Sequence, residues 1–233
     1  MHVKAIRQRS TARSTVAKHR PRAKFEFDSA AQVRITDKGI AEHLIRERQK
    51  LGIDLYDEVW DGVYVMSPIA NNEHQAMAFR LGYVVSDVVP TAEGTVFVGC
   101  NVSDRVDGWE KNYRCPDVAL YLITNSANDC GTHWCGGPDW LTEVLSDGDE
   151  SRRKMDFYEK VGVQEVLLVD RDPWCIELYR RTKGKLTLAG KSDLDAPNVL
   201  QSAVLPLTFQ LVPGVSRPVI LVKHADGTRQ WHV

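Results

Sequence analysis

Short runs of alternating or continuous apolar residues dominate the chain, and they outnumber the segments with helical spacing. Successive side chains of a strand point to opposite faces, so a period of two indicates strands, and a short apolar run indicates a buried one. The stretches of this kind are residues 95–99, 115–123, 140–146, 164–170, 175–181, 184–190 and 203–212. We therefore expect a mixed α/β (α+β) fold, in which one mixed β-sheet is flanked by helices.

In three other segments the apolar residues recur at helical spacing. Residues 36–51 form a short amphipathic pattern. A second stripe begins after Asn72, which we expect to be the N-cap, and continues to Val88. The third helix is predicted to run from Asp149 as its N-cap to Gly162 as its C-terminal stop.

An N-terminal β-hairpin is predicted within residues 56–68, "YDEVWDGVYVMSP". Asp61-Gly62 suits the positive φ angles of a two-residue turn, and strand-like residues flank it on both sides. Such a turn pairs Glu58 with Val65 and places Glu58 on the apolar face of the hairpin.

An acid occupies an apolar position in the strand at residues 140–146. Glu143 shares one face with Leu141 and Leu145, and burying an unpaired carboxylate there would cost several kcal/mol, roughly. Glu143 must therefore be protonated, paired or bound to a metal. Asp139 lies four residues away along the strand, roughly 13 Å, which is too far to share one ion with Glu143.

A lysine on the next helix is a natural partner for this acid. Lys154 lies on the apolar stripe with Phe157 and Tyr158, and Tyr158 itself is most simply a packing residue. A helix that follows a strand folds back over it, which would bring Lys154 to Glu143. A buried ion pair would explain both residues. Asp117, on a neighbouring strand, adds a second carboxylate that one lysine cannot neutralise, whereas a divalent cation could.

The overall charge hides an uneven distribution. The 233 residues include 30 basic and 31 acidic ones, yet residues 1–24 hold eight Lys or Arg and no acid, which leaves 22 basic against 31 acidic residues in the remainder. We expect a basic, flexible arm at 1–25, or alternatively a transit peptide, then one domain at 26–215 and a C-terminal extension at 216–233. No apolar stretch is long enough to cross a bilayer, so a cytoplasmic protein without membrane contact is expected.

The cysteines do not predict a disulfide framework. Five are present, and an odd, sparse set is typical of reduced thiols. Cys130, His133 and Cys135 are close enough in sequence to suggest zinc, but a fourth ligand and a second paired spacing are missing. The signatures of serine hydrolases, P-loop NTPases and dinucleotide-binding proteins are also missing, so no organic cofactor is expected.

The order of these motifs resembles a known family. Pro116-Asp117, "EVLS" at 143–146, Lys154 and Tyr158 in the next helix and "VQEVLLVDRDP" beyond are similar to the family called "putative restriction endonuclease" within the PD-(D/E)xK nuclease superfamily. The hairpin followed by His74 is similar to the beginning of that family. The resemblance covers residues 35–212. In the usual superfamily site the lysine stands two residues after the acid, where this chain has Leu145, and Lys154 matches the position on the following helix.

The resemblance implies a restriction-endonuclease-like fold and a Mg²⁺ (or Mn²⁺)-dependent endonuclease that acts on DNA as a homodimer. It implies that Asp117, Glu143 and the backbone carbonyl of Val144 bind the metal. Lys154 would orient the attacking water or stabilise negative charge on the phosphate.

Two further residues have both a catalytic and a structural interpretation. Glu58 could be an additional acidic ligand or base, or an edge carboxylate that reaches solvent. His74 could hydrogen-bond to a metal ligand and hold it in place, or it could be a half-buried core histidine whose hydrogen bonds are purely structural. A catalytically inactive nucleic-acid or protein interaction module of the same fold is the alternative function, although the acidic body would repel phosphate. These residue types do not distinguish DNA from RNA.

Overall fold

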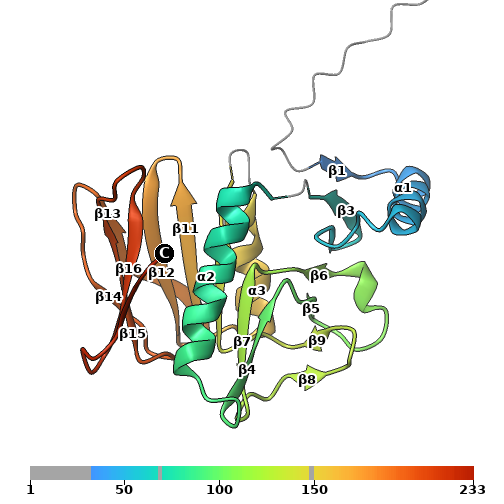
Figure 1. Ribbon diagram of the computed structural model, residues 1–233. Helices are drawn as coiled ribbons and strands as arrows, with labels where there is room; N and C mark the ends of the chain where they lie inside the picture. The colour runs from blue at the N-terminus through green and yellow to red at the C-terminus, as the bar shows by residue number, and fades with distance from the viewer. Residues whose placement is uncertain (1–32, 68–69, 147–149) are drawn as a thin grey trace, which may run out of the picture.

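The computed structural model describes residues 33–67, 70–146 and 150–233 (Figure 1). The arm expected at residues 1–25 lies outside the described residues. The described residues form three β-sheets, three α-helices and two short 3-10 helices. This architecture confirms the mixed α/β class, with more strand than helix.

The central sheet has six strands in the order β13-β12-β11-β10-β7-β4. These strands are β4 (Gly94–Val98), β7 (Val118–Leu122), β10 (Trp140–Val144), β11 (Glu165–Arg171), β12 (Trp174–Thr182) and β13 (Lys185–Asp193). β10 is antiparallel to β7 and parallel to β11, so the helical segment between β10 and β11 is a crossover connection. All six strands coincide with stretches that the hydrophobic pattern predicts.

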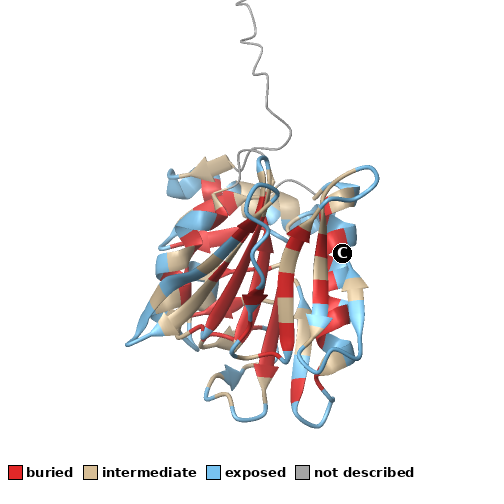
Figure 2. Ribbon diagram, turned by 90° about the vertical axis from the view of Figure 1, so that its left-hand side faces the viewer, coloured by how far each residue is buried: buried red, intermediate tan, exposed pale blue. Residues whose placement is uncertain are grey.

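The two faces of the central sheet are covered differently (Figure 1). Helix α2 (Asn72–Val88) and a separate four-stranded sheet pack on one face, where Leu81, Leu120 and Phe209 belong to one apolar cluster. Helix α3 (Met155–Val161) packs on the other face, where Leu141 and Tyr158 belong to a second cluster. Figure 2 shows the buried residues running along the strands between these layers.

The C-terminal part of the chain corrects one prediction. Residues 203–212 do not extend the central sheet: the strand begins only at Leu207, after Pro206, which has no N–H to donate, and it belongs to the four-stranded sheet. The strands of that sheet are β14 (Leu200–Gln201), β15 (Leu207–Val212), β16 (Val219–His224) and β17 (Gln230–His232). The boundary expected after residue 215 therefore falls between β15 and β16, which are hydrogen-bonded neighbours.

The third sheet carries the hairpin. Its strands, in spatial order, are β1 (Val33–Ile35), β3 (Val63–Met66), β2 (Glu58–Trp60), β6 (Tyr113–Arg114), β5 (Val102–Ser103), β9 (Trp134–Cys135) and β8 (Asn128–Asp129). The register pairs Glu58 with Val65, and both turn residues, Asp61 and Gly62, have positive φ, which confirms the predicted hairpin. Four of the other strands have only two residues, too few to show a period. Helix α1 (Lys38–Leu51) packs on this sheet through Ala41.

Two helix starts differ from the prediction. Asn71, not Asn72, is the N-cap of α2: its backbone is extended and its side chain accepts a hydrogen bond from the His74 N–H. The third helical segment begins as a 3-10 helix, η2 (Ser151–Lys154), and only then becomes α3; a further 3-10 turn, η1 (Trp109–Lys111), precedes β6. The expected N-cap Asp149 lies outside the described residues, whereas Gly162 ends α3 in the left-handed conformation as predicted.

No helix among residues 33–67, 70–146 and 150–233 is both long enough and apolar enough to span a bilayer.

Candidate functional site

The candidate site lies beside the end of β10, between the central sheet, α2, the helical segment and the hairpin. Glu143 comes from β10 and Lys154 from the end of η2. Asp117 directly precedes β7, the neighbour of β10. Glu58 comes from β2 of the other sheet, and His74 from the first turn of α2.

Lys154 joins two acids. Its ammonium nitrogen Nζ lies 2.9 Å from Oε1 of Glu58 and 3.1 Å from Oε1 of Glu143. All three residues are buried, with 4%, 1% and 3% of their surface exposed, respectively. The expected contact between Lys154 and Glu143 is therefore present, and Glu58 belongs to the same cluster rather than reaching solvent.

Local structure explains why these charges meet. The period of two along β10 turns Glu143 toward α3, in the cluster that contains Leu141 and Leu145. The hairpin register turns Glu58 inward, where the indole N–H of Trp60 and the backbone N–H of Cys115 donate to its two carboxylate oxygens. These neutral donors hold Glu58 in place without cancelling its charge.

Asp117 is held by both of its oxygens. Oδ1 lies 2.7 Å from Nε2 of His74, and Oδ2 accepts a hydrogen bond of 2.7 Å from the backbone N–H of Val144. The other ring nitrogen of His74 lies 3.2 Å from Oγ of Ser146. His74 therefore orients Asp117, and the Asp117 side chain keeps 19% of its surface exposed, more than the other acids of the cluster.

The cluster has more negative than positive groups. The pKa of Glu143 is raised from 4.5 to about 8: burial raises it most, Lys154 lowers it, and the neighbouring Asp117 and Glu58 carboxylates raise it. Three carboxylates face one ammonium, so a second cation would lower the energy of the charged state.

Tyr158 is a site residue that the sequence pattern missed. Its hydroxyl donates a hydrogen bond to Oε1 of Glu143, so it is more than a packing residue. Burial raises the pKa of Tyr158 well above its ordinary value, which keeps this donor protonated. The available signal was its position one helical turn after Lys154, on the same face.

The donor chemistry fits a divalent cation. Carboxylate oxygens, together with the neighbouring Val144 carbonyl, are the hard ligands that Mg²⁺ prefers, and the surplus of negative charge favours a cation. However, no three His, Cys, Asp or Glu side chains in the described part of the chain are arranged around a common point. Lys154 lies between Glu58 and Glu143, so binding would require these side chains to separate.

Other sequence candidates lie outside the cluster. Asp139 accepts hydrogen bonds from the backbone of Leu122 and the side chain of Asn125 through Oδ2, which is a structural role. His133 stacks on Trp109 at 4.8 Å between ring centroids. It does not form a metal-binding group with the nearby cysteines among the described residues.

Comparison with known proteins shows where the chain belongs. No curated protein matches it. Its structure is similar to the crystal structure of "a putative nuclease belonging to DUF820 from Anabaena variabilis ATCC 29413", with a TM-score of 0.49 and 20% sequence identity, over 63% of this chain and 80% of that chain. Residues 52–214, well over half of the chain, match the family Uma2, described as "Putative restriction endonuclease". All but the last two of these residues lie inside residues 35–212, over which the motifs of the chain resemble that family. The chain belongs to this family.

Proposed function

We propose that the protein is a metal-dependent endonuclease that hydrolyses phosphodiester bonds of DNA. The observation that carries the proposal is the convergence of Asp117, Glu143 and Lys154, from three separate elements, in one cluster with surplus negative charge. Membership of a family of restriction-endonuclease type supports the same reaction class.

Each residue has a distinct role in this proposal. Asp117, Glu143 and the Val144 carbonyl would hold Mg²⁺ or Mn²⁺, which would neutralise a phosphate oxygen and lower the pKa of a water molecule. Lys154 supplies positive charge to the phosphate as negative charge develops on it. Glu58 forms a second ion pair with Lys154, and His74 fixes the orientation of Asp117.

The test is nicking of supercoiled plasmid with Mg²⁺ or Mn²⁺. Glu143→Gln, Asp117→Asn and Lys154→Met should each lower the rate by at least about 100-fold, because each removes charge from the reacting centre. Asp139→Asn is the matched control: it changes another Pro-Asp aspartate, outside the cluster, and should nick at the wild-type rate. Equal nicking by all four variants would attribute the activity to a contaminant.

Two further experiments test the class of nucleic acid that is cut and the oligomeric state of the protein. Matched DNA and RNA oligonucleotides compare the two backbones, and DNA is expected to be cut faster. The proposed homodimer predicts a molar mass of twice the chain mass, which equilibrium sedimentation measures at several concentrations.

One observation favours the alternative of an inactive module. Lys154, Glu58 and Glu143 already satisfy one another and have at most 5% of each side chain exposed, as in a purely structural ion cluster. Calorimetric titration with Mn²⁺ separates the two functions. Saturable binding that Asp117→Asn abolishes supports the enzyme, whereas heat changes that are unaffected by that substitution favour the module.

A further inference from the structure

A cleft of about 470 Å³ lies next to the carboxylate cluster, on the other side of Trp60. Trp60 belongs to both places: its indole N–H donates to Glu58, and its ring lines the cleft. Strand β1, the hairpin, β6 and α3 supply the walls. Four basic residues line the cleft against two aspartates, Asp61 and Asp156, both exposed. The lining of the cleft therefore holds more basic than acidic residues, beside a cluster of carboxylates.

Arg114 is the buried cation of this cleft, with 4% of its surface exposed. Its Nη1 donates to the backbone carbonyls of Val59 and Tyr113 and to Oδ1 of Asn112, all neutral acceptors. Its Nε is buried and has no hydrogen-bond partner, and no carboxylate of the described residues forms an ion pair with it. Burying a guanidinium that forms no ion pair is costly, and an anion in the cleft would supply one.

Aromatic rings hold this guanidinium in place. The Cζ atom of Arg114 lies 4.9 Å from the ring centroid of Trp60 and 4.3 Å from that of Phe157. Arg34 also packs over Trp60, at 4.6 Å. Because two guanidinium groups already pack on the indole, it offers little surface on which a nucleobase could stack. The cleft is better suited to a compact anion than to a base.

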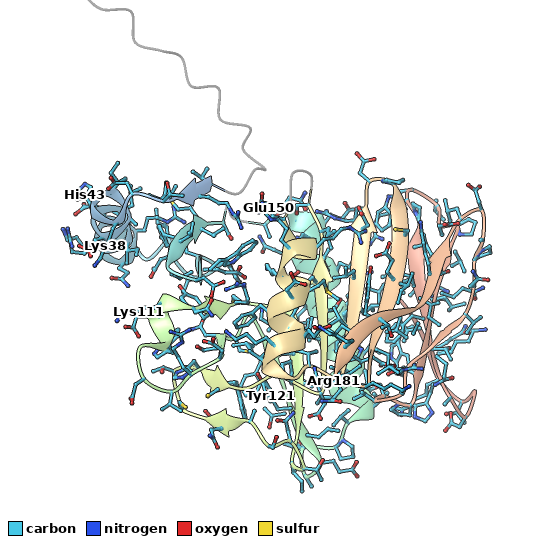
Figure 3. All side chains as sticks on the ribbon, turned by 180° about the vertical axis from the view of Figure 1, so that it is seen from behind. Lys38, His43, Lys111, Tyr121, Glu150 and Arg181 are labelled. Carbon is cyan, nitrogen blue, oxygen red and sulfur yellow. The ribbon has the colours of Figure 1, made fainter. Side chains whose placement is uncertain are left out.

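The rim of the cleft holds two further guanidinium groups. Arg34 and Arg153 both pair with Glu150, each at 2.8 Å, so two guanidinium groups share one carboxylate. Figure 3 shows Glu150 near the beginning of the helical segment, toward the sheet that carries β1. Lys160, in contrast, pairs with Asp104 at 2.7 Å and needs no further anion.

We propose that this cleft binds a backbone phosphate of the nucleic-acid strand, one that flanks the phosphate to be cleaved. The inference rests on the proposed nuclease function. Arg114 donates to the phosphate from the base of the cleft, and Arg153 and Arg34 donate from its rim, since guanidinium groups match phosphate oxygens with paired N–H donors. Trp60 links this contact to Glu58, so that a bound strand passes beside the carboxylate cluster.

The experiment measures binding without catalysis. A fluorescein-labelled DNA duplex is titrated with the full chain in EDTA, and anisotropy is recorded over a range of salt concentrations. Arg153→Ala should weaken binding roughly tenfold near 0.1 M salt and lower the slope of log K against log salt by about 1. Arg152→Ala is the matched control, because the adjacent Arg152 is also exposed but pairs with Glu177 and Asp170 away from the cleft; it should bind like the wild type.

A second variant and a competitor complete the test. Arg114→Lys keeps the charge but loses the paired donors, and should weaken binding in the same direction, with folding checked by thermal melting. Inorganic phosphate should compete with the duplex for the wild type and less for Arg153→Ala. Equal binding of the duplex by Arg152→Ala and Arg153→Ala overturns the inference. Binding of inorganic phosphate in the cleft that does not displace the duplex overturns it as well. Cleft-dependent binding without plasmid nicking would contradict only the proposed function.

Discussion

Two buried glutamates on neighbouring parallel strands differ in how their charge is compensated. Glu143 on β10 is 3% exposed and Glu165 on β11 is 0% exposed. Glu165 accepts hydrogen bonds from Arg180, from the Ser202 hydroxyl and from the backbone N–H of Ala203. One acid thus meets one guanidinium and two neutral donors, which is a closed structural network.

Glu143 has a different balance. It shares Lys154 with Glu58 and lies near Asp117, so negative groups outnumber positive ones. The two glutamates show that burial of an acid does not by itself identify a functional site. The uncompensated charge around Glu143 makes it the candidate of the two, because a ligand can relieve that charge.

The largest expected effect concerns stability. Glu165→Ala should lower the free energy of unfolding by about 3 kcal/mol, because it leaves Ser202 and the Ala203 N–H without their acceptor and Arg180 without its counter-charge. Urea denaturation at pH 7 measures the loss. Glu165→Gln keeps the shape and should lose less, and the folded fraction of either variant should nick plasmid normally. A loss of nicking without a loss of stability would remove the distinction between the two acids.

A smaller effect is expected from the residue that orients Asp117. His74→Asn should weaken Mn²⁺ binding by about 10- to 100-fold, as is typical when a group that supports a metal ligand is removed. Calorimetric titration measures the affinity. His133→Asn is the matched control, since His133 is similarly buried, at 5% against 8%, but lies outside the cluster. Equal affinity of both variants would limit His74 to a packing role.

The effect that is smallest per pH unit sharpens the comparison through the pH dependence of stability. The folded protein holds the Glu143 proton with a pKa of about 8, above the ordinary value of 4.5, so folding is favoured most below about pH 4.5 and this contribution is lost as the pH rises to about 8. The slope is at most about 1.4 kcal/mol per pH unit. Denaturation in EDTA at several pH values should show this decline in the wild type and not in Glu143→Gln. A decline that persists in the variant would assign it to another group.

Much of the fold could be predicted because its central strands are long enough to show a period. The hairpin was predictable in register, since Asp61-Gly62 permits only a tight turn and fixes Glu58 opposite Val65. The two-residue strands were not, because two residues carry no periodic signal. The separate C-terminal sheet was missed for another reason: alternation along residues 203–212 indicates a strand but not which sheet it joins.

The site was predictable in part, for the same kind of reason. Glu143 and Lys154 stood out because each is a charge at an apolar position. Arg114 did not, because a two-residue strand before a proline has no apolar face on which a charge would look misplaced. The hydrogen bond from Tyr158 was also hidden, since a tyrosine on a buried helix face usually needs no explanation beyond packing.

The hairpin turn affects how two sheets of the chain come together during folding. Glu58 and Glu143 belong to different sheets and repel each other when both are charged, and the Lys154 amine between them offsets this repulsion. A slip of one residue in the pairing of β2 with β3 would turn Glu58 to the opposite side and leave Lys154 with one acid. A two-residue turn on the protein surface thus selects which folded arrangement can bring the two sheets together.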